Sequence, residues 1–160
     1  MTPLRESDLA ARLRAAGLRV TAPRLAVLTA LADAPHSTAD DVAGHVREAL
    51  GSVSTQAIYD VLRACVSAGL VRRIEPAGSS ARYETRIGDN HHHLVCRGCG
   101  RVADVDCVVG AAPCLHPAGV EDGFTVDEAE VVFWGTCADC RAQQQVSFHH
   151  ITHQDEESAE

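Results

Sequence analysis

The sequence predicts an α+β protein in two parts: an N-terminal winged helix-turn-helix domain, followed by a small domain built around a four-cysteine metal site. Three observations lead to this fold class. Four stretches with helical spacing of apolar residues precede two short strand-like stretches. Two C-x-x-C pairs, Cys96–Cys99 and Cys137–Cys140, follow in the second half. The charge also changes sign: residues 1–88 hold eleven Arg against nine acids, and residues 89–160 hold three Arg against thirteen acids.

Composition narrows the class of protein. Apolar residues make up 46% of the 160 residues, which is enough for real hydrophobic cores. No apolar run reaches membrane-spanning length and the N-terminus has no signal-peptide core, so we expect a cytoplasmic protein with no membrane partner. Seven cysteines, an odd number that includes two C-x-x-C pairs, favour metal binding over a disulfide framework.

Four helices are predicted in the first half. Gly17, Gly51 and Gly69 are placed to end three of them, while Thr21 and Ser54 are placed as N-caps. The expected helices are residues 7–16, 23–32, 37–50 and 55–68.

Two strands, residues 70–75 and 81–85, flank a Pro/Gly/Ser turn and predict a β-hairpin. Helices followed by a hairpin are typical of a winged helix-turn-helix, with the recognition helix starting at Ser54. A helical bundle with an unrelated hairpin is the alternative. In the second half we expect strands at 93–95, 102–105 and 124–134, an irregular segment at 107–123, and a His- and acid-rich disordered tail from residue 148.

The four cysteines of the C-x-x-C pairs predict a structural zinc site. Four thiolates fill the tetrahedral shell of Zn(II) and leave no open position. The alternative is a redox pair, but that motif requires a βαβ context that the sequence lacks. The imidazoles of His91 and His93 lie two residues apart on an extended segment, so both point to one side, and they are harder ligands suited to a different metal.

Five motifs carry a resemblance to a known family. They are LRVTAPR at 18–24, STQAIYDVL at 54–62, ARYE at 81–84, HHHLVCRGCG at 91–100 and WGTCADC at 134–140. In this order and spacing the chain resembles the ferric uptake regulator (Fur) family over about residues 8–141. Within the family it is most similar to the actinobacterial FurA/CatR type, which is associated with catalase-peroxidase genes. That similarity rests on QAIYD at 56–60, DVDC at 104–107 and DEAEV at 127–131.

The resemblance implies a dimeric, metal-dependent repressor in which a winged helix reads double-stranded DNA and a C-terminal α/β domain dimerises. The implied organisation is a DNA-binding domain at 1–86, a hinge at 87–90, a metal-binding dimerisation domain at 91–147 and a tail at 148–160. Besides structural Zn(II) at Cys96, Cys99, Cys137 and Cys140, it implies a regulatory Fe(II) or Mn(II) site with ligands from both domains. Those ligands are His36, Glu84, His91, His93 and Asp104.

The start of the predicted recognition helix supplies the DNA contacts. Residues expected to reach base edges are Ser54, Thr55, Gln56 and Tyr59. Residues expected to hold phosphates are Arg19, Arg24 and Arg63. Tyr59 could instead be a core aromatic.

Two positions depart from the family pattern. Asp60 stands where relatives often have Arg, so it is either a repulsive specificity element or faces away from DNA. Ala129 stands where many relatives carry a further histidine ligand, so that additional metal site is expected to be absent or rebuilt.

Several other residues have weaker expectations. We expect Cys65 in the core, and His92 either near the metal ligands or facing solvent. Cys107, Cys114 and His116 are either filler or an auxiliary metal or redox site. The tail residues His149, His150 and His153 are candidates for weak metal binding.

The leading functional hypothesis is a repressor inactivated by peroxide, controlling catalase-peroxidase and oxidative-stress genes. Asp104 favours it, since peroxide-sensing relatives have a similar aspartate, and the expected damage is oxidation of His36 or His91. A Cys96–Cys99 disulfide with loss of zinc is the competing switch. The alternatives are an iron- or zinc-uptake regulator and a zinc-stabilised interaction module. An enzyme is not expected, because the four-cysteine site is closed and no catalytic set or small organic substrate site is evident.

Overall fold

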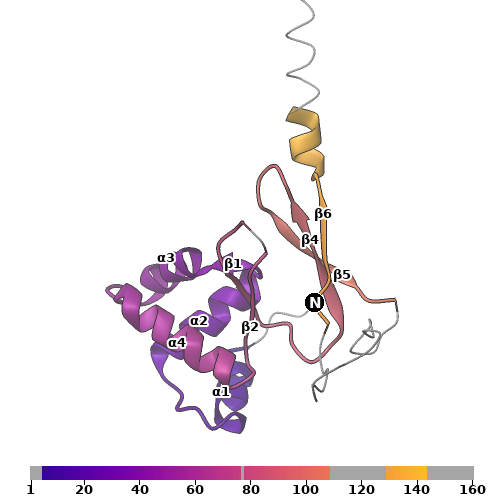
Figure 1. Cartoon of the computed structure of the whole chain (residues 1–160). Helices are drawn as coiled ribbons and strands as arrows, with labels where there is room; N and C mark the ends of the chain where they lie inside the picture. The colour runs from indigo at the N-terminus through magenta and orange to yellow at the C-terminus, as the bar shows by residue number, and fades with distance from the viewer. Residues whose placement is uncertain (1–4, 77, 109–128, 144–160) are drawn as a thin grey trace, which may run out of the picture. The chain divides into compact units, whose positions relative to one another are not determined.

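The computed structural model describes residues 5–76, 78–108 and 129–143. The chain divides into two compact units, Met1–Asp89 and Asn90–Glu160, which we call the N-terminal unit and the C-terminal unit. Each is described by itself (Figure 1). The expectations for residues 109–128 and 144–160, including Cys114, His116 and the tail histidines, lie outside the described residues.

Helices make up most of the N-terminal unit, and all four were predicted to within a few residues. They are α1 (Glu6–Ala15), α2 (Ala22–Asp33), α3 (Ala39–Leu50) and α4 (Thr55–Ser67). The Ser54 hydroxyl accepts a hydrogen bond from the Ala57 N–H at 3.2 Å and so caps α4 as expected. Thr21 occupies the N-cap position of α2, but its side chain makes no cap hydrogen bond. Among the described residues, no helix has the length and apolar character needed to cross a membrane.

The core of the N-terminal unit is formed by the inward faces of the four helices. Its fully buried side chains are Leu9, Leu13, Val27, Leu28, Leu31, Val42, Val46, Ile58 and Cys65. Cys65 is therefore a small core residue, as predicted, and burial raises the pKa of its thiol.

A three-stranded antiparallel sheet completes the N-terminal unit, with strand order β1-β3-β2. Its strands are β1 (Ser37–Thr38), β2 (Arg72–Ile74) and β3 (Arg82–Glu84). The hairpin β2–β3 was predicted, whereas β1 was not. Ser37 and Thr38 were assigned to a helix, but they pair with Tyr83 and Arg82, and α3 begins only at Ala39. This pairing joins segments more than forty residues apart, so local spacing could not reveal it.

The C-terminal unit contains a second three-stranded sheet, in the order β5-β4-β6 (Figure 1). Its strands are β4 (His91–Cys96), β5 (Val102–Asp106) and β6 (Val132–Gly135). β4 lies antiparallel to β5 and parallel to β6. The expected strand at 124–134 was too long: residues 129–131 are not in a strand, because pairing with β4 begins only at Val132 opposite His93. Residues 138–143 are helical, which was not predicted.

Candidate metal centre and nucleic-acid interface

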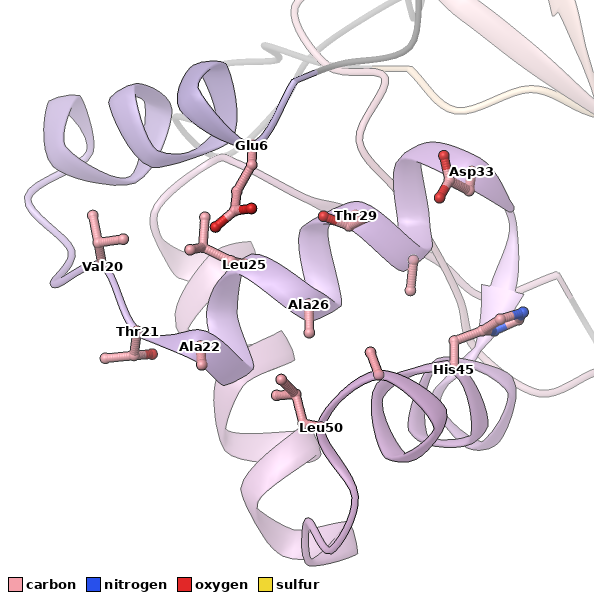
Figure 2. Close-up of a pocket in the computed structure, with 12 residues that line it drawn as sticks. Glu6, Val20, Thr21, Ala22, Leu25, Ala26, Thr29, Asp33, His45 and Leu50 are labelled. Atoms are coloured by element: carbon pink, nitrogen blue, oxygen red, sulfur yellow. The ribbon is translucent and has the colours of Figure 1, made fainter.

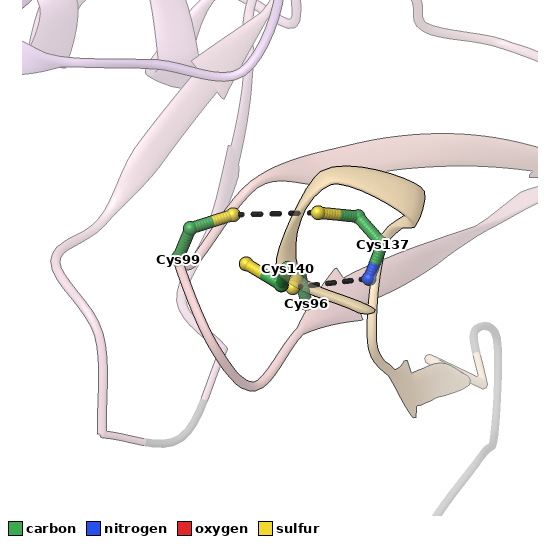
Figure 3. A group of neighbouring side chains, drawn as sticks. All are labelled: Cys96, Cys99, Cys137 and Cys140. Atoms are coloured by element: carbon green, nitrogen blue, oxygen red, sulfur yellow. Dashed lines mark hydrogen bonds between the residues drawn. The ribbon is translucent and has the colours of Figure 1, made fainter. Parts of the chain in front are cut away.

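Cys96, Cys99, Cys137 and Cys140 converge in the C-terminal unit (Figure 3). Their sulfur atoms all lie within 4.8 Å of one another, and Cys99 Sγ and Cys137 Sγ are 3.8 Å apart. Four sulfurs bound at about 2.3 Å to one tetrahedral Zn(II) lie about 3.8 Å from each other. That separation is also far beyond a disulfide bond length. The four side chains therefore fit a closed zinc site.

The local backbone is shaped for this cluster. Cys96 ends β4, and the turn that follows is closed by the Gly100 N–H donating to the Cys96 carbonyl at 2.9 Å. A Cβ atom at Gly98 would lie 2.9 Å from the Cys140 sulfur, so only glycine leaves room for the thiolate. The second knuckle is tied to the first by the Arg97 N–H, which donates to the Gly135 carbonyl at 2.8 Å.

The cluster already favours a thiolate at one position. The Cys137 N–H donates to Cys96 Sγ at 3.2 Å, and this bond, together with the N–H groups of Cys99 and Gly98, lowers the pKa of Cys96 to about 6. The neighbouring sulfurs of Cys137 and Cys99 raise the pKa of Cys140 to about 12. Backbone donors thus stabilise the first negative charge, and a bound cation would be needed to stabilise the rest.

A second group of potential ligands lies on β4 and β5 of the C-terminal unit. His91 and His93 point to the same side, as predicted, with ring centroids 5.0 Å apart. Each Nε2 atom lies 3.9 Å from Oδ1 of Asp104, which is the strand partner of His93. Atoms that bind one ion at about 2.0–2.2 Å can lie at most about 4.4 Å apart. Asp104 can therefore share a metal ion with His91 or with His93.

The other two predicted regulatory ligands lie together in the N-terminal unit. Nε2 of His36 is 3.0 Å from Oε2 of Glu84, and both side chains are buried. This distance suits a hydrogen bond and equally suits two adjacent corners of one coordination shell. His36 precedes β1 and Glu84 ends β3, so the β1–β3 pairing that the sequence did not reveal is what brings them together. The single site uniting these two ligands with His91, His93 and Asp104 stays a prediction.

His92 does not face solvent. Its side chain is buried, and its ring meets that of Phe133 edge to face with centroids 6.0 Å apart. The solvent-facing alternative for His92 was therefore wrong.

The outward face of α4 carries the predicted DNA-reading residues. Ser54, Thr55 and Gln56 are exposed at its start, and Tyr59 is 41% exposed one turn further on. The core interpretation of Tyr59 is therefore wrong. The other tyrosine, Tyr83 on β3, is the one that packs in the core.

The carboxylate of Asp60 contacts two of the predicted DNA-binding side chains on α4. Its Oδ1 accepts a hydrogen bond from Nε2 of Gln56 at 3.0 Å, and the guanidinium of Arg63 lies 3.7 Å away. All three side chains are exposed and lie on successive turns of α4. Gln56 and Arg63, which the sequence assigned to DNA separately, are thus joined through the one acid that departs from the family pattern.

Arginine contacts position the segments around α4. Arg47 of α3 donates to the Thr55 hydroxyl at 2.8 Å and to the Val53 carbonyl at 3.2 Å, which fixes the entry to the helix. Arg24 donates to the carbonyl of Arg19 at 2.8 Å, so two of the three predicted phosphate-binding arginines lie together. Arg47 was not predicted from the sequence, because neither a motif nor a period marks a residue that acts across a helix connection.

The N-terminal unit also has a groove of about 570 Å³ between α2 and α3 (Figure 2). Its floor is formed mainly by alanine and leucine side chains, and Glu6, Asp33 and His45 contribute its charged or titratable groups. None of the predicted metal ligands or DNA-reading residues lines it.

Comparison with known proteins places these features in a family. A sequence model described as the ferric uptake regulator family matches residues 15–108. The transcriptional regulator FurA of Mycobacterium tuberculosis is 60% identical over 133 residues, covering 83% of this chain and 90% of that protein. Ferric uptake regulation protein 1 of Mycolicibacterium fortuitum is 53% identical over 147 residues, covering 92% and 91%. The structure of the ferric uptake regulator from Pseudomonas aeruginosa with manganese superposes with a TM-score of 0.60 at 30% identity, covering 81% of this chain and 98% of that one.

Proposed function

Since this chain belongs to the ferric uptake regulator family, whose members are metal-dependent transcriptional regulators, we propose that it is a repressor that binds a double-stranded DNA operator as a homodimer. The observation that carries the proposal is the pairing of ligand groups inside each unit. His36 with Glu84 in one unit, and Asp104 with each of His91 and His93 in the other, have donor atoms at separations that one metal ion can bridge.

A metal ion bound by all five side chains would fix the angle between the two units. Two imidazoles with a carboxylate on one side, and an imidazole with a carboxylate on the other, form a mixed nitrogen and oxygen donor set that suits Fe(II) or Mn(II). In this proposal the ion is the co-repressor, because only a fixed angle presents both DNA-reading helices of a dimer together. Zn(II) at the four cysteines has a separate, structural role.

DNA binding is assigned to α4 and the β2–β3 wing. The exposed residues at the start of α4, Ser54, Thr55, Gln56 and Tyr59, would face base edges in the major groove. Arg19, Arg24 and Arg63 would contact phosphates and set orientation without specifying sequence. We expect a palindromic A·T-rich operator, since two copies of one helix read two half-sites.

The dimer is assigned to the C-terminal unit. Leu94 of β4 and Phe133 of β6 are direct neighbours in the sheet register, and both remain more than 40% exposed. Adjacent exposed apolar side chains on a sheet are typical of a surface that another subunit covers.

For the signal we propose peroxide. Bound Fe(II) supplies a one-electron reductant for peroxide, whereas Mn(II) and Zn(II) do not. Peroxide cleaved by one electron would give hydroxide and a hydroxyl radical, and the radical would add to the imidazole of His36 or His91 beside the ion. Loss of one further electron to the Fe(III) so formed, and of a proton to solvent, would leave an oxygenated ring that no longer offers its ligand lone pair. Loss of that ligand would release the angle between the units and hence the DNA, which would allow expression of catalase-peroxidase and other oxidative-stress genes.

A thiol switch is the second candidate, and one observation favours it. The lowered pKa of Cys96 gives this residue thiolate character near neutral pH, and Cys99 is close enough in sequence to form a disulfide with it. An iron- or zinc-uptake regulator without peroxide chemistry is the remaining alternative.

Two experiments test the proposal. Footprinting of the Mn(II) form on the DNA upstream of its own gene should protect a palindrome, and the absence of any protected duplex would contradict DNA binding. The Fe(II) form is then treated briefly with peroxide and analysed by tryptic mass spectrometry. Loss of DNA binding with oxygen on His36 or His91 supports the histidine switch. Loss of DNA binding with unmodified histidines and a Cys96–Cys99 bridge supports the thiol switch.

A further inference from the structure

We propose that Asp60 holds the side-chain amide of Gln56 in one orientation, and that α4 therefore selects adenine at one position of each operator half-site. The inference rests on the proposed function, in which α4 is the recognition helix. It assigns a specificity role to the acid that departs from the family pattern.

The geometry for this role is already present in the free helix. Gln56 and Asp60 are four residues apart, so their side chains are neighbours on one face, and Nε2 donates to Oδ1 at 3.0 Å. Arg63 approaches the same Oδ1 atom from the next turn at 3.7 Å. Asp60 is thus held from both sides along the exposed face of α4.

The chemistry of the carboxylate decides which way the amide turns. An ionised carboxylate only accepts hydrogen bonds, so Gln56 must direct its NH₂ group, and not its oxygen, toward Asp60. One N–H is then used, and the amide has Oε1 and a single N–H left for other partners. An acceptor beside a donor is the complement of the adenine N6–H and N7 in the major groove.

Guanine is disfavoured by the same arrangement. Its major-groove edge offers two acceptors, O6 and N7, and therefore needs two donors. The held amide has one N–H to offer and would place Oε1 against an acceptor, while the negative charge of Asp60 stands close by. An arginine at position 60 would instead present donors, bind Oε1 and turn the NH₂ group of Gln56 outward.

The test uses the full-length Mn(II)-loaded protein and a set of operator duplexes in which each base pair is replaced in turn. Binding is measured by fluorescence anisotropy for the wild type and for Q56A, D60A, D60N and the double variant Q56A/D60A. The wild type should prefer A·T over G·C about 10-fold at one position per half-site, the size expected for a bidentate base contact. Q56A and D60A should lose the preference at that same position, and the double variant should lose no more than either single variant.

D60N and one further variant, E48A, separate the orientation of the amide from the charge of the carboxylate. D60N keeps an acceptor but can also present a donor, so its preference should lie between those of the wild type and D60A. E48A removes a carboxylate from the exposed face of α3, so it changes the net charge by the same amount as D60A. It should therefore change the overall affinity for DNA but leave the base preference unchanged.

Three results would overturn the inference. The first is that D60A keeps the full adenine preference. The second is that Q56A and D60A affect different base pairs and their effects add. The third is that D60A changes the affinity equally for every duplex. If the wild type binds no duplex at all with Mn(II) present, the proposed function falls and this inference falls with it. That outcome differs from a wild type that binds specifically without any contribution from Asp60.

Discussion

Among the residues that the structure describes, His36 is the non-glycine residue with a positive φ, at 61°, which places its backbone in the left-handed region. A side chain in this region costs about 1–2 kcal/mol, so the surrounding structure must hold it there. Two contacts do so: Ser37 and Thr38 pair with β3, and Nη1 of Arg82 donates to the His36 carbonyl at 3.0 Å. The strained backbone in turn directs the His36 imidazole to Glu84.

We therefore predict that Arg82→Met weakens Mn(II) binding about 5- to 30-fold, which corresponds to the 1–2 kcal/mol of strain that would no longer be opposed. Methionine keeps most of the side-chain volume but donates no hydrogen bond. Affinity is measured by titration calorimetry on the zinc-loaded protein. Arg73→Met is the matched control, since Arg73 lies on the neighbouring strand and pairs with exposed Glu75. An unchanged Mn(II) affinity in Arg82→Met would show that His36 needs no help from Arg82.

The two tyrosines give a second prediction at this scale. Tyr59 is 41% exposed, so Tyr59→Ala should change the free energy of unfolding by less than about 0.5 kcal/mol while relaxing sequence preference on DNA. Tyr83→Ala should cost about 3–5 kcal/mol, because Tyr83 packs in the core. Urea unfolding and duplex binding measure the two effects. A uniform loss of affinity on all duplexes by Tyr59→Ala would mean that Tyr59 does not read bases.

Among the elements, α3 has the most complete N-terminal cap. Thr38 accepts from the Asp41 N–H at 3.2 Å, while Asp41 Oδ2 accepts from the Thr38 N–H at 2.9 Å and from its hydroxyl at 2.7 Å. This reciprocal pair is a capping box. Thr38 of the capping box is also a residue of β1, so the contacts that start α3 also hold the strand that follows His36.

The cap predicts a pH-dependent contribution to stability. Hydrogen bonds from the Thr38 side chain and backbone lower the pKa of Asp41 in the folded state. A lowered pKa stabilises the fold above the ordinary pKa of about 3.9, and this stabilisation is lost as the pH falls through the folded value. Asp41→Asn should therefore be destabilised at pH 7, and its difference from the wild type should shrink at pH values below about 4. Asp40→Asn, which removes an exposed carboxylate one residue earlier, should show less dependence on pH. A constant difference between Asp41→Asn and the wild type from pH 7 to pH 3 would contradict the prediction.

Helices were predictable from the sequence to the extent that their signals are local. Glycine stops at Gly17, Gly51 and Gly69 and the Ser54 cap act within one turn of the residue that carries them, and the structure has positive φ at all three glycines. Strand ends depend instead on distant partners. β1 was missed because Ser37 and Thr38 resemble a helix start, and β6 was drawn too long because residues 129–131 are not in a strand and the pairing with β4 begins at Val132.

The residues of the candidate sites likewise differ in whether a local sequence pattern marks them. The four cysteines were identified from the two C-x-x-C pairs together with the family resemblance, since four thiolates fill the tetrahedral shell of Zn(II). The contacts of Arg47, Arg82 and Asp60 could not be foreseen, because each acts through one hydrogen bond to a partner that no motif marks. Such residues become visible only when the fold has placed their partners.

At the scale of the whole molecule, the two units are stabilised by different means. The N-terminal unit has a contiguous core from four helices, with many fully buried leucine and valine side chains. Among the described residues of the C-terminal unit, the buried apolar side chains are Val95, Cys96 and Val102. A zinc ion at the four cysteines would add stabilisation to this described part of the unit.

Charge divides between the same two parts. Residues 1–88 carry a small excess of arginine, whereas residues 89–160 carry ten more acids than arginines. Repulsion between like charges opposes folding of the C-terminal part and keeps it from the DNA backbone. We therefore expect the specific DNA contacts in the N-terminal unit and the largest effect of a bound cation in the C-terminal unit.

From this division we predict that Cys140→Ser unfolds the C-terminal unit and leaves the N-terminal unit folded. A structural zinc ion contributes on the order of 10 kcal/mol of apparent binding free energy at neutral pH, and we expect this to be folding free energy in a unit whose described part buries few apolar side chains. The variant should lose bound zinc by native mass spectrometry, become monomeric, and keep most of its helical circular dichroism, because α1–α4 and their core do not depend on the metal. Cys107→Ser is the matched control, since Cys107 lies in the same unit outside the four-cysteine cluster and should retain zinc, dimer and melting temperature. A zinc-free Cys140→Ser dimer that melts at the wild-type temperature would show that the C-terminal unit is held together by something other than the metal.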